Sequence, residues 1–396
     1  MPFALASCVS HDLQPDNRPN LRALSAEEVT VSAANNDFGF NLFRNLEQQN
    51  SGNMFISPLS VGMALGMTLN GASPATQESI LKTIEFGNLQ PSEVNQAYKD
   101  LTGLLTSMDR TVEMDMANSI WYKKELTVKG PFASVIQNYY SGTIQGLDFS
   151  DPSSVKTINQ WVEGKTKNKI KNLLSEIDPN AVMFLINAIY FKGNWNNQFD
   201  PALTKPADFK LEDGSLQQVP MMFSKGVKLF RYQHDQFLLA DIPYGNKQFG
   251  MTILLPNTGR TVKDINALLS ADSLSHWLNQ ADSIQPELTM PKFKMEWKKD
   301  LKTNLMKMGM AMADFPDLIE EQLPLKIDKV IHQSFIEVNE QGSEAAAATA
   351  VEIGYTAVGP PAIQLIQINR PFLFIIREKH SGVILFIGQL ADPSNN

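Results

Sequence analysis

The sequence predicts an α+β fold in which helices come first and strands follow. Apolar residues recur at three- and four-residue intervals in residues 31–48, which is the spacing of one helix face. From residue 182 onward, continuous apolar runs rich in β-branched and aromatic residues take over, as is typical of strands covered on both faces. No period of 20–50 residues repeats, which argues against a repeat architecture. These observations favour mixed sheets covered by helices.

The individual elements follow in chain order. A first helix is predicted over residues 31–48, and a second begins at Pro58, where Ser57 can cap the helix and proline suits its first turn. A third, amphipathic helix is predicted over residues 159–174. Its lysines are expected to form a solvated face rather than a polyanion site, and they are Lys165, Lys167, Lys169 and Lys171. The apolar runs that predict strands are residues 182–191, 251–256, 372–376 and 383–387.

Composition limits the classes of partner. The chain has 396 residues and a net charge of −8, with a pI near 5.3. Nucleic acid is therefore not an expected partner, because phosphate binding needs a clustered basic surface. Cys8 is the single cysteine, so no disulfide within the chain is expected. No apolar run reaches the length of a membrane-spanning helix.

Residues 1–35 are predicted to be a flexible N-terminal tail, ahead of a single domain over residues 36–396. The stretch 9–28 is polar, contains two prolines and has little apolar surface to bury. Residues 5–8, Leu-Ala-Ser-Cys, are similar to the lipobox of bacterial lipoproteins, so Cys8 is a candidate lipidation site in a signal-peptide remnant. The segment before it is short for a signal peptide, which leaves an incidental cysteine as the alternative. An extracellular or cell-envelope location is expected, with membrane contact only through a lipid on Cys8.

Patterns typical of catalysis and metal binding are missing from the sequence. No two of the five histidines stand at metal-ligand spacing, and there is no His-Glu-x-x-His, Gly-x-Ser-x-Gly, Gly-x-Gly-x-x-Gly or phosphate-loop sequence. Cys8 in a flexible tail is a poor nucleophile. The sequence therefore predicts a binding or inhibitory protein that is not an enzyme, with no metal and no cofactor.

Residues 340–353 alternate between two kinds of side chain. From Ser343 to Ile353 every second residue is small or apolar, whereas the intervening positions carry two glutamates and three alanines. An extended segment points successive side chains to opposite faces, so this pattern is typical of a half-buried strand. The alanines also suit a helix, and composition alone leaves that alternative open. A segment able to lie outside a sheet or to enter one can act as a switch.

A series of motifs in order along the chain resembles the serpin family, in particular inhibitory members such as those of prokaryotes. The resemblance runs over roughly residues 36–394. It rests on residues 53–60 (NMFISPLS), 159–163 (NQWVE), 187–195 (NAIYFKGNW), 243–245 (PYG), 290–293 (MPKF) and 370–374 (RPFLF). It implies an α+β fold of three β-sheets with about nine helices and an exposed reactive-centre loop over about residues 341–362.

The resemblance also implies a protease inhibitor that acts as a suicide substrate. A serine protease, or a cysteine protease, would cleave the loop and form an acyl-enzyme, and the freed hinge would insert into the central sheet. Counting forward along the hinge places the cleaved bond at Thr356-Ala357, with Tyr355-Thr356 as the second choice. Counting back from Arg370 lands near Pro360 instead, so the position of the bond stays open. The small residues favour an elastase-like target, whereas Tyr355 favours a chymotrypsin- or subtilisin-like one.

Three residue sets carry over from the family by position. The implied shutter, which would hold the central strands closed, is Ser57, Ser60, Asn187 and His332. The implied breach, where the loop would enter, is Trp195, Lys292 and Glu340. The implied hinge is Glu340, Gly342, Ser343, Glu344, Ala345, Ala346, Ala347, Ala348 and Thr349. An ordinary core or capping role is the alternative for each set.

The expected partner is a target protease in a covalent complex, and the chain is expected to be a monomer. The inward positions of the hinge carry no charge and no proline, either of which would slow insertion between strands. This favours an inhibitor over a non-inhibitory carrier or chaperone, which is the alternative function.

Overall fold

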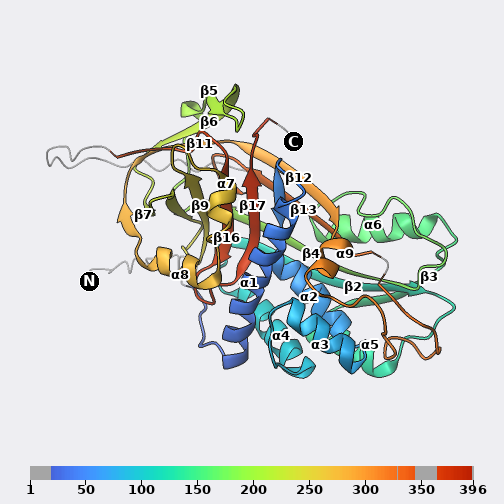
Figure 1. The fold of residues 1–396 in the computed structure, drawn as a ribbon. Coiled ribbons are helices and arrows are strands. Elements are labelled where there is room, and N and C mark those ends of the chain that lie inside the picture. Colours follow the sequence, from blue (N-terminus) through green and yellow to red (C-terminus); the bar gives the residue numbers. More distant parts are fainter. Residues whose placement is uncertain (1–18, 328, 344–363, 395–396) are drawn as a thin grey trace, which may run out of the picture.

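The computed structural model contains three β-sheets with helices packed against them (Figure 1). It describes residues 19–327, 329–343 and 364–394. Most of the buried apolar side chains in these residues join one core, and a second cluster lies between α6 (Ser153–Lys165) and a six-stranded sheet. The predicted α+β class with three sheets is confirmed.

The six-stranded sheet holds the candidate site. α6 contacts one face of this sheet and α2 packs on the other (Figure 1). The long apolar run predicted from residue 182 is therefore a strand with both faces covered. In order across the sheet, the strands are β12 (Phe293–Asp300), β13 (Ile331–Val338), β14 (Gly342–Ser343), β4 (Met183–Asn194), β2 (Val112–Lys123) and β3 (Thr143–Leu147).

The other two sheets complete the body. The seven-stranded sheet consists of β1 (Met54–Ile56), β17 (Ile384–Leu390), β16 (Phe372–Glu378), β9 (Phe249–Pro256), β8 (Phe237–Pro243), β7 (Leu229–Gln233) and β10 (Asp282–Ile284). The four-stranded sheet consists of β15 (Leu365–Gln367), β11 (Glu287–Pro291), β6 (Leu216–Lys225) and β5 (Lys205–Lys210). The apolar runs at 251–256, 372–376 and 383–387 fall in β9, β16 and β17, as predicted, except that β17 starts one residue later.

Nine α-helices occur in the described residues. They are α1 (Ala26–Glu47), α2 (Pro58–Leu69), α3 (Pro74–Thr83), α4 (Pro91–Ser107), α5 (Gly130–Tyr140), α6, α7 (Val262–Asn266), α8 (Ala271–Asn279) and α9 (Lys302–Lys307). Among these helices, none combines the length and the apolar character that crossing a membrane requires.

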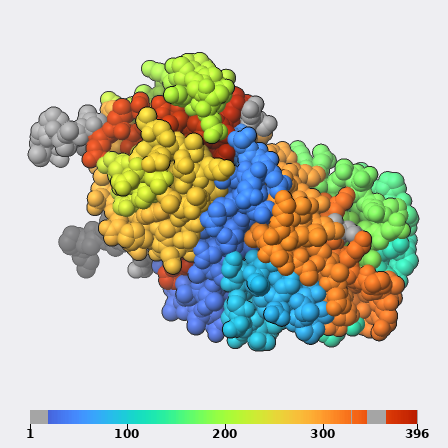
Figure 2. Space-filling view, in the orientation of Figure 1, coloured from blue at the N-terminus to red at the C-terminus, as the bar shows by residue number. Residues whose placement is uncertain are grey.

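The first helix begins earlier than predicted. It starts at Ala26, so residues 26–35 belong to the folded body and not to a flexible tail. Ser25 caps the helix together with Glu28, because Glu28 N donates to Ser25 Oγ at 3.1 Å and Ser25 N donates to Glu28 Oε2 at 2.8 Å. Figure 2 shows this blue helix lying between the yellow and orange parts of the chain. The capping residues Ser25 and Glu28 are visible in the sequence. The first turn of the helix is polar, however, and so resembles the predicted tail before it.

The third predicted helix ends earlier than predicted. α6 stops at Lys165, and Lys167 and Asn168 have φ values of +50° and +63°, left-handed conformations that do not continue a helix. Residues 166–178 therefore form a non-helical segment over the sheet. Two of its lysines, Lys167 and Lys169, lie beside carboxylates of the strands, so the four lysines do not form one helix face.

Candidate functional site

β14 lies between β13 and β4 at one end of the six-stranded sheet, which we call the upper end. Ser343 pairs with Val338 of β13 and with Gly193 of β4. Below it, β13 and β4 each pair with an outer strand, and among the described strands they form no ladder with each other. We call the space between residues 331–337 of β13 and 183–192 of β4 the slot. At the upper end, β14 separates the two strands by the width of one strand.

Small residues allow β14 to fit between its neighbours. A Cβ added to Gly342 would lie 2.0 Å from the carbonyl oxygen of Gly193, so only glycine fits at this position. Ser343 is 1% exposed, and its Oγ lies 2.6 Å from Tyr244 Oη. The hydroxyl pair satisfies two buried polar groups, which would destabilise the fold if they were unpaired. The hinge therefore starts inside the sheet.

An aromatic pair holds the turn that leads into β14. The backbone N of Trp195 donates to Gln341 O at 2.7 Å, and its Nε1 donates to Asn339 O at 2.9 Å. The indole ring stacks on Tyr244 with ring centroids 4.4 Å apart. Trp195 thus contacts the turn before β14 and also the hydroxyl-bearing ring that binds Ser343.

Glu340 ties the same turn to the chain around the four-stranded sheet. Lys292 Nζ donates to Glu340 Oε2 at 3.0 Å, and Thr204 Oγ1 donates to Oε1 at 2.8 Å. Burial alone would raise the pKa of Glu340, but its backbone amide, Thr204 and Lys292 outweigh burial and lower the pKa. Glu340 is therefore charged at neutral pH. The structure brings together the three residues of the predicted breach, which are Trp195, Lys292 and Glu340.

The N-terminus of α2 is hydrogen-bonded to both sides of the slot. Ser57 caps this helix, since its Oγ accepts from Ser60 N at 3.2 Å, and its own backbone N donates to His332 Nε2 of β13 at 3.1 Å. On the other side, Ser60 Oγ donates to the carbonyl oxygen of Asn187 in β4 at 3.4 Å. Asn187 Nδ2 also donates to Asn118 Oδ1 of β2. The four residues of the predicted shutter therefore lie together and connect β13 to β4 through α2.

Acid is expected to weaken this connection at His332. The imidazole must be neutral to accept from Ser57 N, and burial lowers the pKa of His332 from 6.5 to about 4. Because the pKa is lower in the folded than in the unfolded state, the stabilisation is complete above about pH 6.5 and is lost as the pH falls towards 4. A shift of this size corresponds to about 3 kcal/mol. Urea unfolding between neutral pH and pH 4 measures the loss.

Two variants show whether His332 causes that pH dependence. His332→Gln should flatten the profile of unfolding free energy against pH between 6.5 and 4. His276→Gln, at an exposed position of α8, should keep the wild-type profile. A wild-type profile in His332→Gln would contradict the assignment.

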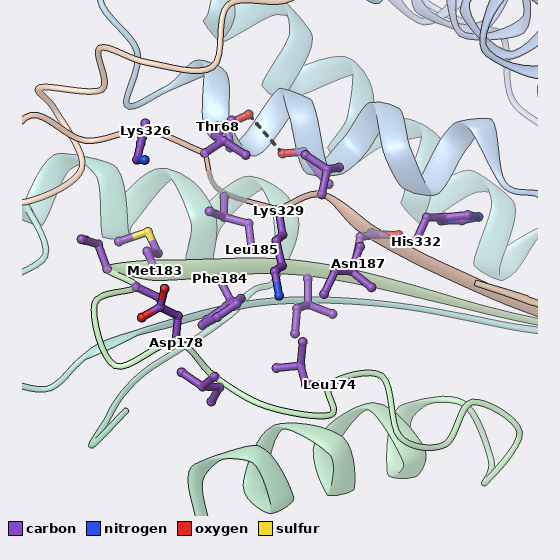
Figure 3. A pocket seen from close by; sticks show the side chains of 18 of the residues that line it. Thr68, Leu174, Asp178, Met183, Phe184, Leu185, Asn187, Lys326, Lys329 and His332 are labelled. Carbon is purple, nitrogen blue, oxygen red and sulfur yellow. Dashed lines mark hydrogen bonds between the residues drawn. The ribbon is translucent and has the colours of Figure 1, made fainter. Parts of the chain in front are cut away.

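A cavity of about 430 Å³ lies at the lower end of the slot (Figure 3). Its walls come from α2, from β4, from residues 173–178, and from residues 325–327 and 329–332. Asn187 and His332 line it beside apolar residues such as Leu65, Leu174 and Leu185. The size and the apolar lining suit a few apolar side chains or a small molecule. In residues 19–327, 329–343 and 364–394, no cluster of three or more His, Cys, Asp or Glu could hold a metal.

Comparison with known proteins identifies the family. The family model described as "Serpin (serine protease inhibitor)" matches residues 33–393. The chain belongs to the serpin family. Human leukocyte elastase inhibitor is 33% identical to this serpin over 385 residues, which cover 92% of this chain and 99% of the relative. Human Serpin B11 is 32% identical over 394 residues, covering 92% and 100%. Serpins are protease inhibitors rather than enzymes, as the sequence predicted for this chain.

Solved structures show the same fold. Human thyroxine-binding globulin, in complex with thyroxine, has a TM-score of 0.86 with this serpin at 29% identity, covering 93% of this chain and 100% of the other. Tengpin, a thermophilic serpin in its native state, has a TM-score of 0.84 at 28% identity, covering 95% and 97%. The fold is thus shared by another serpin in its native state and by a globulin named for binding thyroxine.

Part of the predicted site lies outside the described residues. This part comprises Cys8, the hinge positions Glu344, Ala345, Ala346, Ala347, Ala348 and Thr349, and the residues of the two candidate reactive bonds, Tyr355, Thr356 and Ala357. Sequence analysis missed Tyr244, Thr204 and Asn118. Tyr244 stood in the family motif at 243–245, but its contact with Ser343 joins residues far apart in the chain.

Proposed function

We propose that this serpin inhibits serine proteases as a suicide substrate, and that its cleaved loop fills the slot as a new strand. The observation that carries the proposal is β14, since a strand that already runs between β13 and β4 at the upper end can continue downward. An added strand would satisfy the slot-facing backbone groups of both neighbours.

The register of β14 gives the inserted strand a definite position. Thr349 is six residues after Ser343, Asn187 is six residues before Gly193, and His332 is six residues before Val338. In an antiparallel ladder on both sides, Thr349 would therefore lie level with Asn187 and His332. Val351 and Ile353 would follow into the level of Leu185 and Met183, where the cavity lies.

The alternation of the hinge fits this position. The inward residues Ala345, Ala347 and Thr349 would share the face of Ser343, which is the buried face towards α2 and Tyr244. The two glutamates, Glu344 and Glu352, would point to the opposite face. No charge would therefore enter the core on the α2 side of the sheet when the strand forms, which keeps insertion fast.

Insertion would trap the protease at the acyl-enzyme stage. The catalytic hydroxyl attacks the carbonyl carbon of Thr356, the bond to Ala357 breaks, and Ala357 leaves as a free amine while an ester remains. About fourteen inserted residues at about 3.3 Å each would form a strand roughly 45 Å long, which would carry the ester towards the far end of the sheet. Such a displacement distorts the oxyanion hole, so water no longer hydrolyses the ester efficiently. A cysteine protease would form the corresponding thioester.

The target is proposed to be elastase-like, with a chymotrypsin- or subtilisin-like enzyme as the alternative. Thr356, Ala357 and Val358 suit a small pocket, and human leukocyte elastase inhibitor is a relative at 33% identity. Cleavage after Tyr355 would instead need a larger apolar pocket. The lipid anchor at Cys8, the extracellular location and the monomeric state stay predictions.

A carrier function is the second candidate. It is favoured by the TM-score of 0.86 with thyroxine-binding globulin in its thyroxine complex. A carrier does not need a hinge free of charge on its inward face, whereas this chain has one that begins inside the sheet. Inhibition therefore has the stronger support.

Incubation with elastase-, subtilisin-, chymotrypsin- and papain-type proteases tests the proposal. A complex that survives a denaturing gel is expected with at least one of them, and the mass of the released peptide identifies the cleaved bond. Cleavage by all four enzymes without any covalent complex would contradict the inhibitory function.

A further inference from the structure

Residues 166–178, which we call the strap, cross the α6 face of the six-stranded sheet and are fastened first to β2. Lys167 Nζ lies 3.2 Å from Glu113 Oε1 and 3.5 Å from Asp115 Oδ2, and both carboxylates belong to β2. Glu113 pairs with Lys192 of β4, so these carboxylates lie one strand away from the upper part of the slot. One lysine thus connects the strap to two acidic side chains on one side of the sheet.

The strap is also fastened on the other side of the slot. Lys169 Nζ lies 3.6 Å from Glu337 Oε2 and 5.0 Å from the ring centroid of Phe335, both on β13. Gln333 Nε2 of β13 donates to Lys171 O at 3.2 Å, and Lys298 Nζ of β12 donates to Asn172 O at 3.0 Å. The strap therefore joins the two halves of the sheet, and β4 and the slot lie between its two attachments.

The lower part of the strap borders the place that the inserted strand would take. Leu173, Leu174 and Ile177 are buried, belong to the apolar cluster under α6 and line the cavity between β4 and β13. In Figure 3, Leu174 lies on the opposite side of the cavity from Thr68 of α2. In the register given above, Glu352 would point to this α6 face and meet these apolar side chains, so the strap must shift before insertion is complete.

We propose that Lys167 and Lys169 are positioning residues that set the speed of loop insertion, because the strap must release from β2 or from β13 for the slot to fill. This inference rests on the proposed inhibitory function. All five side chains of these ion pairs are partly exposed, between 34% and 51%, so salt weakens the pairs. Weaker pairs give faster insertion, and faster insertion leaves less time for the acyl-enzyme to hydrolyse.

The test uses neutral variants with a matched control. Lys167→Gln/Lys169→Gln removes the ion pairs of the strap with β2 and β13 and keeps the side-chain stems. Lys171→Gln removes a lysine of the same strap that lies 3.7 Å from Glu163 of α6 and, within the part of the chain that the structure describes, pairs with no carboxylate of a strand. The number of inhibitor molecules consumed per trapped protease is measured with subtilisin and pancreatic elastase from about 0.05 M to about 0.5 M salt, over which screening strengthens severalfold.

In wild type, this number is expected to fall as the salt concentration rises. In the double variant, the excess of this number over one should already be about threefold to tenfold smaller than in wild type at low salt. It should not change as the salt concentration rises. Lys171→Gln should behave as wild type. The proposal would be overturned if the double variant formed complexes with the wild-type yield and the wild-type salt dependence.

Hydrogen exchange in the intact protein tests the attachment of the strap independently of protease inhibition. Backbone amides of residues 166–178 should exchange about threefold to tenfold faster in the double variant than in Lys171→Gln at low salt. Unchanged exchange rates would overturn the claim that Lys167 and Lys169 fasten the strap, whether or not any protease is trapped. Faster exchange without a covalent complex in the wild type would instead overturn the inhibitory function and the role of the strap in it.

Discussion

Ser343→Arg is expected to abolish covalent trapping while leaving cleavage of the loop intact. Ser343 is 1% exposed and bonded to Tyr244 Oη, so an arginine at this inward position would have to bury its charge for β14 to form. Insertion would then be slower than hydrolysis of the acyl-enzyme, and the variant would behave as a substrate. We expect the fraction of trapped protease on a denaturing gel to fall by about a hundredfold or more.

The matched control introduces the same side chain one residue away. Glu344 would occupy an outward position if the register of β14 continued, so Glu344→Arg should retain trapping with a yield within a few-fold of wild type. The fold of both variants is checked by thermal melting of the intact protein. Trapping by Ser343→Arg at the wild-type yield would show that residue 343 does not have to enter the sheet.

The fold could be predicted where the chain signals it locally. Continuous apolar runs gave β4, β9, β16 and β17 nearly within their bounds, since β9, β16 and β17 are buried on both faces and β4 is buried over much of its length. β2 was not singled out, because its sequence mixes glutamate, aspartate and asparagine with apolar residues. The acidic ones pair with Lys167, a residue that the sequence placed in a helix. Only the left-handed turn after α6 brings these groups together.

The candidate site, too, could be predicted where the chain signals it locally. Alternation along residues 340–353 predicted an inward Ser343, and the structure buries it. The family resemblance predicted the sets around Glu340 and His332, and the structure brings the members of each together. Tyr244 and Thr204 satisfy Ser343 and Glu340 from about 100 and 136 residues away, and a single sequence carries no signal for contacts of that range.

Cleavage within the loop is expected to stabilise this serpin strongly. In the intact structure β13 and β4 do not pair with each other in the described residues, and residues 182–185 on the wall of the cavity are partly exposed. An inserted strand would pair with both neighbours and would fill the cavity with Val351 and Ile353. A net gain of several kcal/mol would raise the melting temperature by about 10 °C or more.

Calorimetry of the intact and the loop-cleaved protein therefore tests loop insertion most directly, because it needs neither the physiological protease nor a trapped complex. The cleaved wild type should melt at least about 10 °C above the intact form, and cleaved Ser343→Arg should show no such rise. Equal melting temperatures of the intact and cleaved wild type would contradict insertion and, with it, the proposed mechanism of inhibition.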